Sequence, residues 1–219
     1  MSTPAIAIAG RGAILATGEG PAALWQAAIE GREGCVPLRV PHLSPGRIAA
    51  SAQVPEALDR ACLAAVPLKQ RRYCSPAVAW GVAAARQALA EAGLAADDRA
   101  LRWGLYTAQA GYTHPSMAAY ADLLAECRDA DGLDRKALAA RVLRRKSLDP
   151  FLVLKSLTNG LLGVTSLALG LEGEAAAFME GVAGNHAALA TATAALAAGR
   201  IDAALVVAAG SDLAALALR

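Results

Sequence analysis

The chain has 219 residues, 56% of them hydrophobic, and carries a formal net charge of +2. This apolar content is enough for a substantial core, and the length fits one domain or two small ones. The near-neutral charge argues against nucleic-acid binding, and no uninterrupted apolar run of about 18 residues predicts a membrane span.

The first predicted element is a buried strand at Ala5–Ala9 (AIAIA). Gly10 and Gly12 follow it and are interpreted as a tight turn. A dinucleotide-binding fingerprint would need a third glycine at position 15, which is Leu15. A helix over Ala22–Ile29 comes next and is expected to end at the glycines that follow it.

Residues 35–70 are rich in proline and glycine, which predicts an irregular surface excursion with a helical piece over Glu56–Ala65. Pro76–Ala92 is the clearest helix of the first half. A proline suits its first turn, apolar residues recur at helical spacing, and Gly93 follows as a stop. Arg102–Ala108 is the second predicted strand. The three tryptophans, Trp25, Trp80 and Trp103, are expected in the core.

The second half alternates helices and strands. Predicted helices cover Ser116–Cys127, Arg135–Lys146, Phe151–Leu169 and Ala183–Ala198, with predicted strands at Ala175–Met179 and Ala203–Ala209. The basic cluster Arg141–Lys146 is interpreted as a solvated helix face. Strands that are apolar on both faces and separated by helices predict an α/β fold, with a mostly parallel mixed sheet and helices on both faces. We expect one domain over residues 1–219.

The four cysteines, Cys35, Cys62, Cys74 and Cys127, form no CxxC pair and have no histidine at metal-ligand spacing. The sequence therefore predicts no zinc site, and it indicates no other cofactor. No signal-peptide pattern is visible. We expect free thiols in a reducing compartment, and hence a soluble, cytoplasmic protein.

Five stretches follow one another along the chain: IAIAGRGAILATGEGPAALWQAAIEGREG, SPAVAWGVAAARQALAEAGL, RWGLYTAQAG, DPFLVLKSLTNGLLGVTSLALGLEG and AALATATAALAAGRIDAALVVAAG. In this order they resemble the N-terminal half of β-ketoacyl synthases, which have the thiolase fold. The resemblance covers nearly the whole chain. It implies that a strand, a sharp elbow and a small-residue helix occupy residues 175–199, with Asn159 supporting the elbow by hydrogen bonding.

The chain departs from this family at the elbow. The resemblance implies a nucleophilic cysteine there, and the family's spacing places Val182 at its position, or Gly181 after a shift of one residue. Neither side chain can attack a thioester, because acyl transfer requires a thiolate. The family's two catalytic histidines belong to a second half of the fold, which this sequence of 219 residues does not contain.

The resemblance therefore implies a non-catalytic subunit, similar to a chain-length factor, that supports acyl-chain condensation in fatty-acid or polyketide biosynthesis. Its expected partners are a cysteine-containing ketosynthase and an acyl carrier protein, in a hetero- or homodimer that uses the strand at Ala175–Met179 as its edge. Gly181, Val182, Asn185 and Asn159 are the expected substrate-binding residues.

Two alternatives stay open. Glu180, two residues before Val182, could act as a base in decarboxylation of a malonyl carrier protein, or it could be a polar group at a strand end that backbone donors satisfy. The chain could also be one half of a split or degenerate ketosynthase. In that case the apolar face of its sheet and central helix would be exposed and would need a companion.

Overall fold

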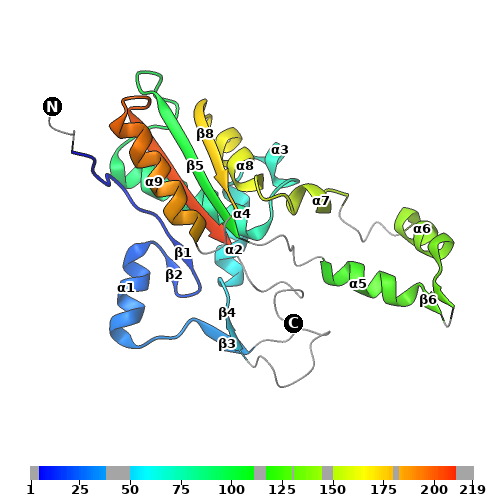
Figure 1. Ribbon diagram of the computed structural model, residues 1–219. Coiled ribbons are helices and arrows are strands. Elements are labelled where there is room, and N and C mark those ends of the chain that lie inside the picture. The colour runs from blue at the N-terminus through cyan, green and yellow to red at the C-terminus, as the bar shows by residue number, and fades with distance from the viewer. Residues whose placement is uncertain are drawn as a thin grey trace.

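A parallel three-stranded sheet forms the centre of the molecule, in the order β8-β5-β9 (Figure 1). The computed structural model describes residues 5–37, 50–110, 117–129, 131–144, 150–179 and 183–210. The strands are β5 (Trp103–Ala110), β8 (Gly173–Phe178) and β9 (Ala203–Gly210). Trp103 pairs with Gly173 on one side and with Ala203 on the other, so all three strands start level. Their carboxyl ends therefore lie at one edge of the sheet.

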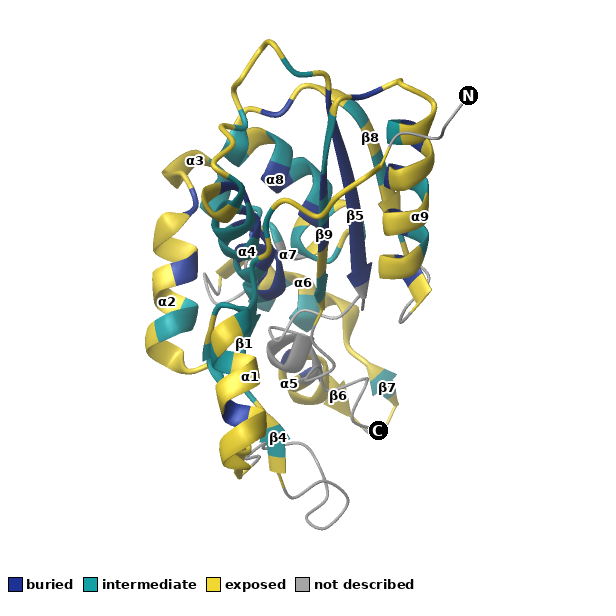
Figure 2. Ribbon diagram, turned by 90° about the vertical axis from the view of Figure 1, so that its left-hand side faces the viewer, coloured by how far each residue is buried: buried dark blue, intermediate teal, exposed yellow. Residues whose placement is uncertain are grey.

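Helices cover both faces of this sheet (Figures 1 and 2). Helix α9 (Gly184–Ala197) lies on one face, and α4 (Pro76–Ala92) and α8 (Gly160–Leu169) lie on the other. This arrangement confirms the predicted α/β fold with helices on both faces. Within the described residues the main sheet is wholly parallel, and antiparallel pairing is confined to two-stranded hairpins.

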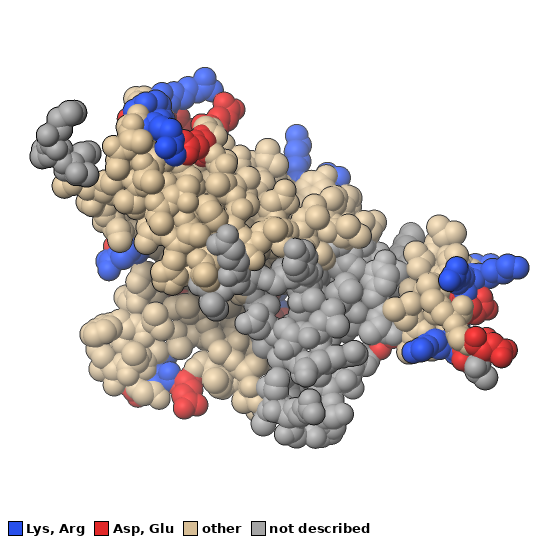
Figure 3. All heavy atoms as spheres, in the orientation of Figure 1, with Lys and Arg blue, Asp and Glu red and all other residues tan. Residues whose placement is uncertain are grey.

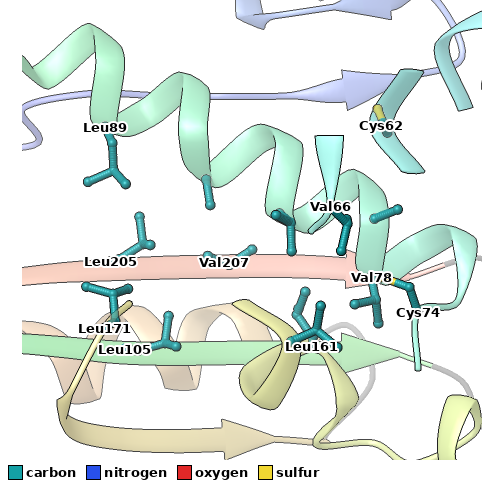
Figure 4. Packing of buried hydrophobic residues seen from close by; sticks show 14 of the residues in the cluster. Cys62, Val66, Cys74, Val78, Leu89, Leu105, Leu161, Leu171, Leu205 and Val207 are labelled. Atoms are coloured by element: carbon teal, nitrogen blue, oxygen red, sulfur yellow. The ribbon is translucent and has the colours of Figure 1, made fainter. Parts of the chain in front are cut away.

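The alternation of side chains along the strands divides the core in two. Leu105 of β5 joins Leu205 and Val207 of β9 in a cluster under α4 and α8 (Figure 4). Tyr106, the next residue of β5, is fully buried on the opposite face against Ala188 and other alanines of α9. Because successive residues of a strand point to opposite faces, one apolar run can serve both cores.

Local signals set the bounds of α4. The Ser75 side chain accepts a hydrogen bond from the Val78 N–H at 3.4 Å, and Pro76 occupies the first helical position. Gly93 ends the helix in the left-handed conformation, with φ of 66°. These features are an N-cap, a first-turn proline and a glycine C-cap, and the predicted bounds Pro76–Ala92 are confirmed.

The remaining elements are short and lie around this body. Figure 1 shows α5, β6, β7 and α6 as an arm that projects from it. The elements are β1 (Ile14–Leu15), β2 (Gly18–Glu19), α1 (Pro21–Glu30), β3 (Cys35–Pro37), β4 (Ala50–Ala52), α2 (Glu56–Ala65), α3 (Leu68–Arg71), α5 (Met117–Glu126), β6 (Arg128–Asp129), β7 (Gly132–Leu133), α6 (Arg135–Arg144) and α7 (Leu152–Lys155). Within the described residues, no helix is long and apolar enough to cross a membrane.

The predicted strand at Ala5–Ala9 is wrong. These residues are exposed and form no strand, and 78% of Ile8 is accessible. The described sheet consists of β8, β5 and β9 alone. The glycines that follow also serve a different purpose from a turn. A Cβ on Gly10 would lie 2.0 Å from the carbonyl oxygen of Ala88 in α4, so the chain needs glycine to pass this close to the helix backbone.

Two further expectations need correction. Phe151–Leu169 is not one helix but two, α7 and α8, separated by residues 156–159. Trp25 is 70% exposed, because α1 buries only Ala27 among its residues. Trp103 is buried as expected, and Trp80 is half-buried with its indole N–H donating to Asp59 at 2.6 Å. In the predicted irregular excursion over residues 35–70, α2 matches the expected helix. The antiparallel pairing of β3 with β4 was not predicted, and residues 38–49 lie outside the described part of the chain.

Candidate functional site

The carboxyl end of the sheet is the candidate site, because the connection from β8 to α9 lies there. Ala108 of β5 pairs with Phe178, the last residue of β8, and α9 begins at Gly184. The predicted succession of strand and core helix on either side of a short connection is therefore confirmed. Crevices at the carboxyl ends of parallel strands are the usual ligand sites of such sheets. Glu180, Gly181 and Val182 fall within this connection and lie outside the described residues.

Gly184 brings the start of α9 onto the ends of two strands. A Cβ at this position would lie 3.3 Å from the Cβ of Ala108 and 3.7 Å from that of Phe178. Ala183, the residue before α9, makes no side-chain capping hydrogen bond. The helix dipole favours negative charge at the end of the β8–α9 connection. An attacking thiolate or a developing oxyanion at this place would be stabilised by that field.

Asn185 lies in the first turn of α9, as predicted, and its side chain hydrogen-bonds within this helix. Its Oδ1 accepts a hydrogen bond from the His186 N–H at 2.9 Å, and both residues are exposed. This contact is a local one at the helix start. Among the described residues, Asn185 makes no hydrogen bond to the neighbouring strands.

A second helix start, that of α8, lies beside the end of β8. The Thr158 hydroxyl donates to the sulfur of Met179, the residue directly after β8. Asn159 follows Thr158 and precedes α8; it is exposed, and its side chain makes no capping hydrogen bond. The contact beside β8 is therefore made by Thr158, and the predicted hydrogen-bonding support of the elbow by Asn159 stays a prediction.

Gln109 caps α8 instead, and sequence analysis missed it. This residue of β5 is only 6% exposed, and its Oε1 accepts the Leu161 N–H at 2.8 Å. The two residues are 52 positions apart. The one available signal was a glutamine within an otherwise apolar strand, RWGLYTAQA. A polar side chain near the end of a buried strand needs a partner.

All four cysteines lie in other parts of the fold. Cys35 is exposed in β3, Cys62 is buried in α2, Cys74 is buried just before α4, and Cys127 is buried after α5. Burial raises the pKa of Cys74 to about 12, and it also raises the pKa of Cys62. These two thiols are therefore protonated and poorly nucleophilic near neutral pH.

The amino end of the sheet carries an ionic network. Arg200 donates to both carboxylate oxygens of Glu174 at 2.8 and 2.9 Å, and the buried Tyr106 hydroxyl donates to the same carboxylate at 2.8 Å. Arg102 makes a similar two-point pair with Asp202, at 2.7 and 2.9 Å. A pocket of about 260 Å³ near this end is lined by residues of β5, α8 and β8, including Trp103 and Leu162. These features lie at the opposite end of the strands from the candidate site.

The face of the molecule over α9 carries no charge. Helix α9 contains no Lys, Arg, Asp or Glu, and 49% of Leu189 is exposed. In Figure 3 this face is tan, and the charged groups gather at its edges. Leu189 is the large apolar side chain exposed on this helix in the described residues.

Comparison with known proteins agrees with this geometry. The model of a family described as β-ketoacyl synthase, N-terminal domain, matches residues 3–219. No curated protein sequence matches the chain.

Similar solved structures include a β-ketoacyl synthase from Burkholderia phymatum STM815, at 19% identity and a TM-score of 0.63, covering 88% of this chain and 43% of that one. The ishigamide ketosynthase/chain length factor is 24% identical with a TM-score of 0.60, covering 90% and 45%. The AntDE:AntF complex, a type II PKS acyl-carrier protein with its ketosynthase bound to the hexaketide, is 16% identical with a TM-score of 0.63, covering 96% and 51%. The chain spans about half the length of these structures, and the likeness establishes the fold.

Proposed function

The chain belongs to the β-ketoacyl synthase family through its N-terminal domain, and we propose that it acts as a ketosynthase-like subunit without a nucleophile of its own. It supports acyl-chain condensation by a catalytic partner, in polyketide or fatty-acid biosynthesis. Residues 1–219 form a single domain in this proposal.

One observation carries the proposal. The strand and the helix that flank the nucleophile's position are in place, and the sequence that joins them, MEGVA, contains no cysteine, serine or threonine. The helix start would favour a thiolate, yet the chain supplies none there. Val182, or Gly181 in the shifted register, takes the nucleophile's position in this proposal.

The uncharged face over α9 supports an obligate association. In addition to Leu189, the described structure leaves Ile8 exposed in the amino-terminal stretch. On the opposite face of the sheet, Leu167 of α8 is 64% exposed. A monomer with these surfaces in water would gain free energy by covering them, at about 25 cal/mol per Å² of apolar area. We therefore propose that another polypeptide, or a second copy of this chain, packs against it.

Strand β8 supplies the edge for that association. Among the described residues it pairs only with β5, so its outer backbone groups are unpaired. Unpaired strand edges are templates for adding a strand of another chain. We propose that the partner is a homologous, cysteine-containing ketosynthase, because the similar structures include a ketosynthase/chain length factor. An acyl carrier protein is the proposed donor, as in the carrier-protein complex among them.

Co-purification tests this proposal. The tagged chain is co-expressed with the cysteine-containing ketosynthase encoded nearest to its gene, and the complex is measured by light scattering. We expect a stable heterodimer that Ala175→Arg in β8 dissociates, because Ala175 is exposed on the edge strand.

Ala28→Arg, at an exposed position of α1, is the matched control and should leave the complex intact. Recovery of the chain as a well-folded monomer without any ketosynthase would contradict the proposal. Recovery of a chain that carries the second half of the fold would instead support the split-synthase alternative.

A further inference from the structure

The pocket near the amino end of the sheet exists because β8 begins with small residues. The pocket has a volume of about 260 Å³. Its apolar walls are formed by Trp103, Leu105, Leu162 and Leu171. Gly173 pairs with Trp103 and Ala175 pairs with Leu105, so these two residues of β8 lie on the α8 face of the sheet with their pairing partners. One has no side chain and the other has only a methyl group, which leaves the space beside α8 open.

Helix α8 does not cover this face of β8. It packs mainly on β5, the central strand. Ala175 and Ala177, which alternate along β8 on this face, are both exposed. The pocket is therefore open beside the outer edge of β8, the edge that has no strand neighbour among the described residues.

The edge of β8 offers little apolar area by itself. Its six residues, GEAAAF, include one glycine and three alanines. A stable protein interface buries about 800 Å² on each partner. A partner that adds a strand to β8 must therefore also contact apolar surface beside the strand, and the pocket is the concave part of that surface.

We infer that the partner strand inserts a large apolar side chain, of the size of leucine, methionine or phenylalanine, into this pocket. The inference rests on the proposed function and specifies the chemistry of the partner at the β8 edge. An added strand lies about 4.8 Å from β8, and its residue opposite Ala175 points to the same face of the sheet. Its side chain then stands beside the pocket, with Gly173 and Ala175 leaving room for it.

The lining selects against a charged occupant. The apolar walls cannot compensate the lost hydration of an ionised group. Glu172, an exposed residue that also lines the pocket, further disfavours an acidic side chain by charge repulsion.

Filling the pocket from this chain tests the inference. Leu162→Trp enlarges a half-buried wall on α8 and leaves the backbone edge of β8 unchanged. We expect the Kd of the complex with the ketosynthase, measured by surface plasmon resonance, to rise about tenfold or more, the effect of displacing one buried apolar side chain. Leu68→Trp, at a 77% exposed position of α3 outside the pocket, is the matched control and should leave the Kd unchanged.

Trp103 reports on the pocket without a substitution in the measured protein, so the test stands even where Leu162→Trp folds poorly. This chain alone is labelled with 5-fluorotryptophan, and a separate Trp103→Phe sample identifies the Trp103 fluorine resonance. We expect this resonance to shift when the ketosynthase binds, because the inserted side chain contacts the indole. The resonance of Trp80, which does not line the pocket, should stay in place.

An unchanged Kd for a folded Leu162→Trp variant, or an unchanged Trp103 resonance in the complex, would overturn the inference and leave the proposed function standing. A small molecule found in the pocket of the isolated chain by native mass spectrometry, with no Trp103 shift on adding the ketosynthase, would assign the pocket to a ligand and also overturn it. Failure of the wild-type chain to bind the ketosynthase would overturn both.

Discussion

Glu174 connects three elements with one carboxylate. It accepts two hydrogen bonds from Arg200, in the turn before β9, and one from Tyr106 of β5. Chiefly through Arg200, and then through Tyr106, these bonds lower the pKa of Glu174 from 4.5 to about 2. The folded state therefore favours the ionised carboxylate, and this preference contributes to stability wherever the unfolded chain is also ionised.

The pH dependence of unfolding should reveal this contribution. It is fully present above pH 4.5 and is lost as the pH falls through about 2, because the folded-state pKa is the lower one. Glu174→Gln should have a lower urea midpoint than wild type at pH 7, and the gap should close between these pH values.

Glu172→Gln removes an exposed carboxylate two positions away and is the control, with a small effect at every pH. A gap for Glu174→Gln that stays constant down to pH 2 would contradict the assigned role of the ion pair.

Glu180 separates the non-catalytic proposal from the decarboxylase alternative. In our account it is a polar group at a strand end, so the complex should release no more carbon dioxide from malonyl carrier protein than the ketosynthase partner with its cysteine blocked. Isotopic carbon dioxide release measures this directly. Release that requires this chain and disappears in Glu180→Gln would establish the alternative instead.

Whether a site residue could be predicted from the sequence depended on how far along the chain its partner lies. Val182, Gly181 and Asn185 were predicted as site residues from their order and spacing along the chain. Gln109 was missed because its partner is 52 residues away, and no local pattern indicates which helix start a strand residue will meet. Glu174 and Arg200 were missed for the same reason.

At the scale of elements, close packing of backbones distinguishes glycines that otherwise look alike. A Cβ on Gly12 would lie 1.9 Å from the carbonyl oxygen of Ala84 in α4, a contact with backbone that cannot move aside. Gly163, within α8, would meet nothing within 4 Å. The two positions therefore predict opposite outcomes for the same substitution.

Gly12→Ala should destabilise the protein by about 1–3 kcal/mol, the usual cost of overpacking. Gly163→Ala should stabilise it by up to about 1 kcal/mol, because alanine is the better helix former. Urea denaturation of both variants checks this pair. Small and equal changes in the free energy of unfolding for the two variants would show that the amino-terminal stretch does not pack against the backbone of α4 as described.

Elements with local start and stop signals were predicted well. Helices α2 and α4 have the predicted bounds, and β5, β8, β9 and α9 lie within a few residues of theirs. The prediction of a strand at Ala5–Ala9 was wrong because an apolar run shows only that a segment can pair. The chain here leads instead to Gly10 and Gly12, which lie against the backbone of α4. The prediction of one helix over Phe151–Leu169 was wrong because it passed over the polar residues Thr158 and Asn159, which lie in the break at residues 156–159.

At the scale of the whole molecule, the distribution of charged and apolar surface supports the proposal that another polypeptide packs against this chain. The ion pairs of Arg102 and Arg200 fasten the amino ends of the strands, while the face over α9 is uncharged (Figure 3). The fold and this surface support the proposed ketosynthase-like subunit, which leaves the attack on the thioester to its partner.

Acyl transfer to the chain itself tests the central claim most directly. The complex is incubated with an acyl-carrier-protein thioester, and the intact mass of this chain is measured for wild type and for Val182→Cys. We predict that the wild-type chain gains no acyl group, because its own cysteines lie elsewhere and Cys62 and Cys74 are protonated. Val182→Cys should gain one acyl group, since the start of α9 favours a thiolate there. An acyl group on a native cysteine of the wild-type chain, or none on the introduced one or on that of Gly181→Cys, would contradict the account.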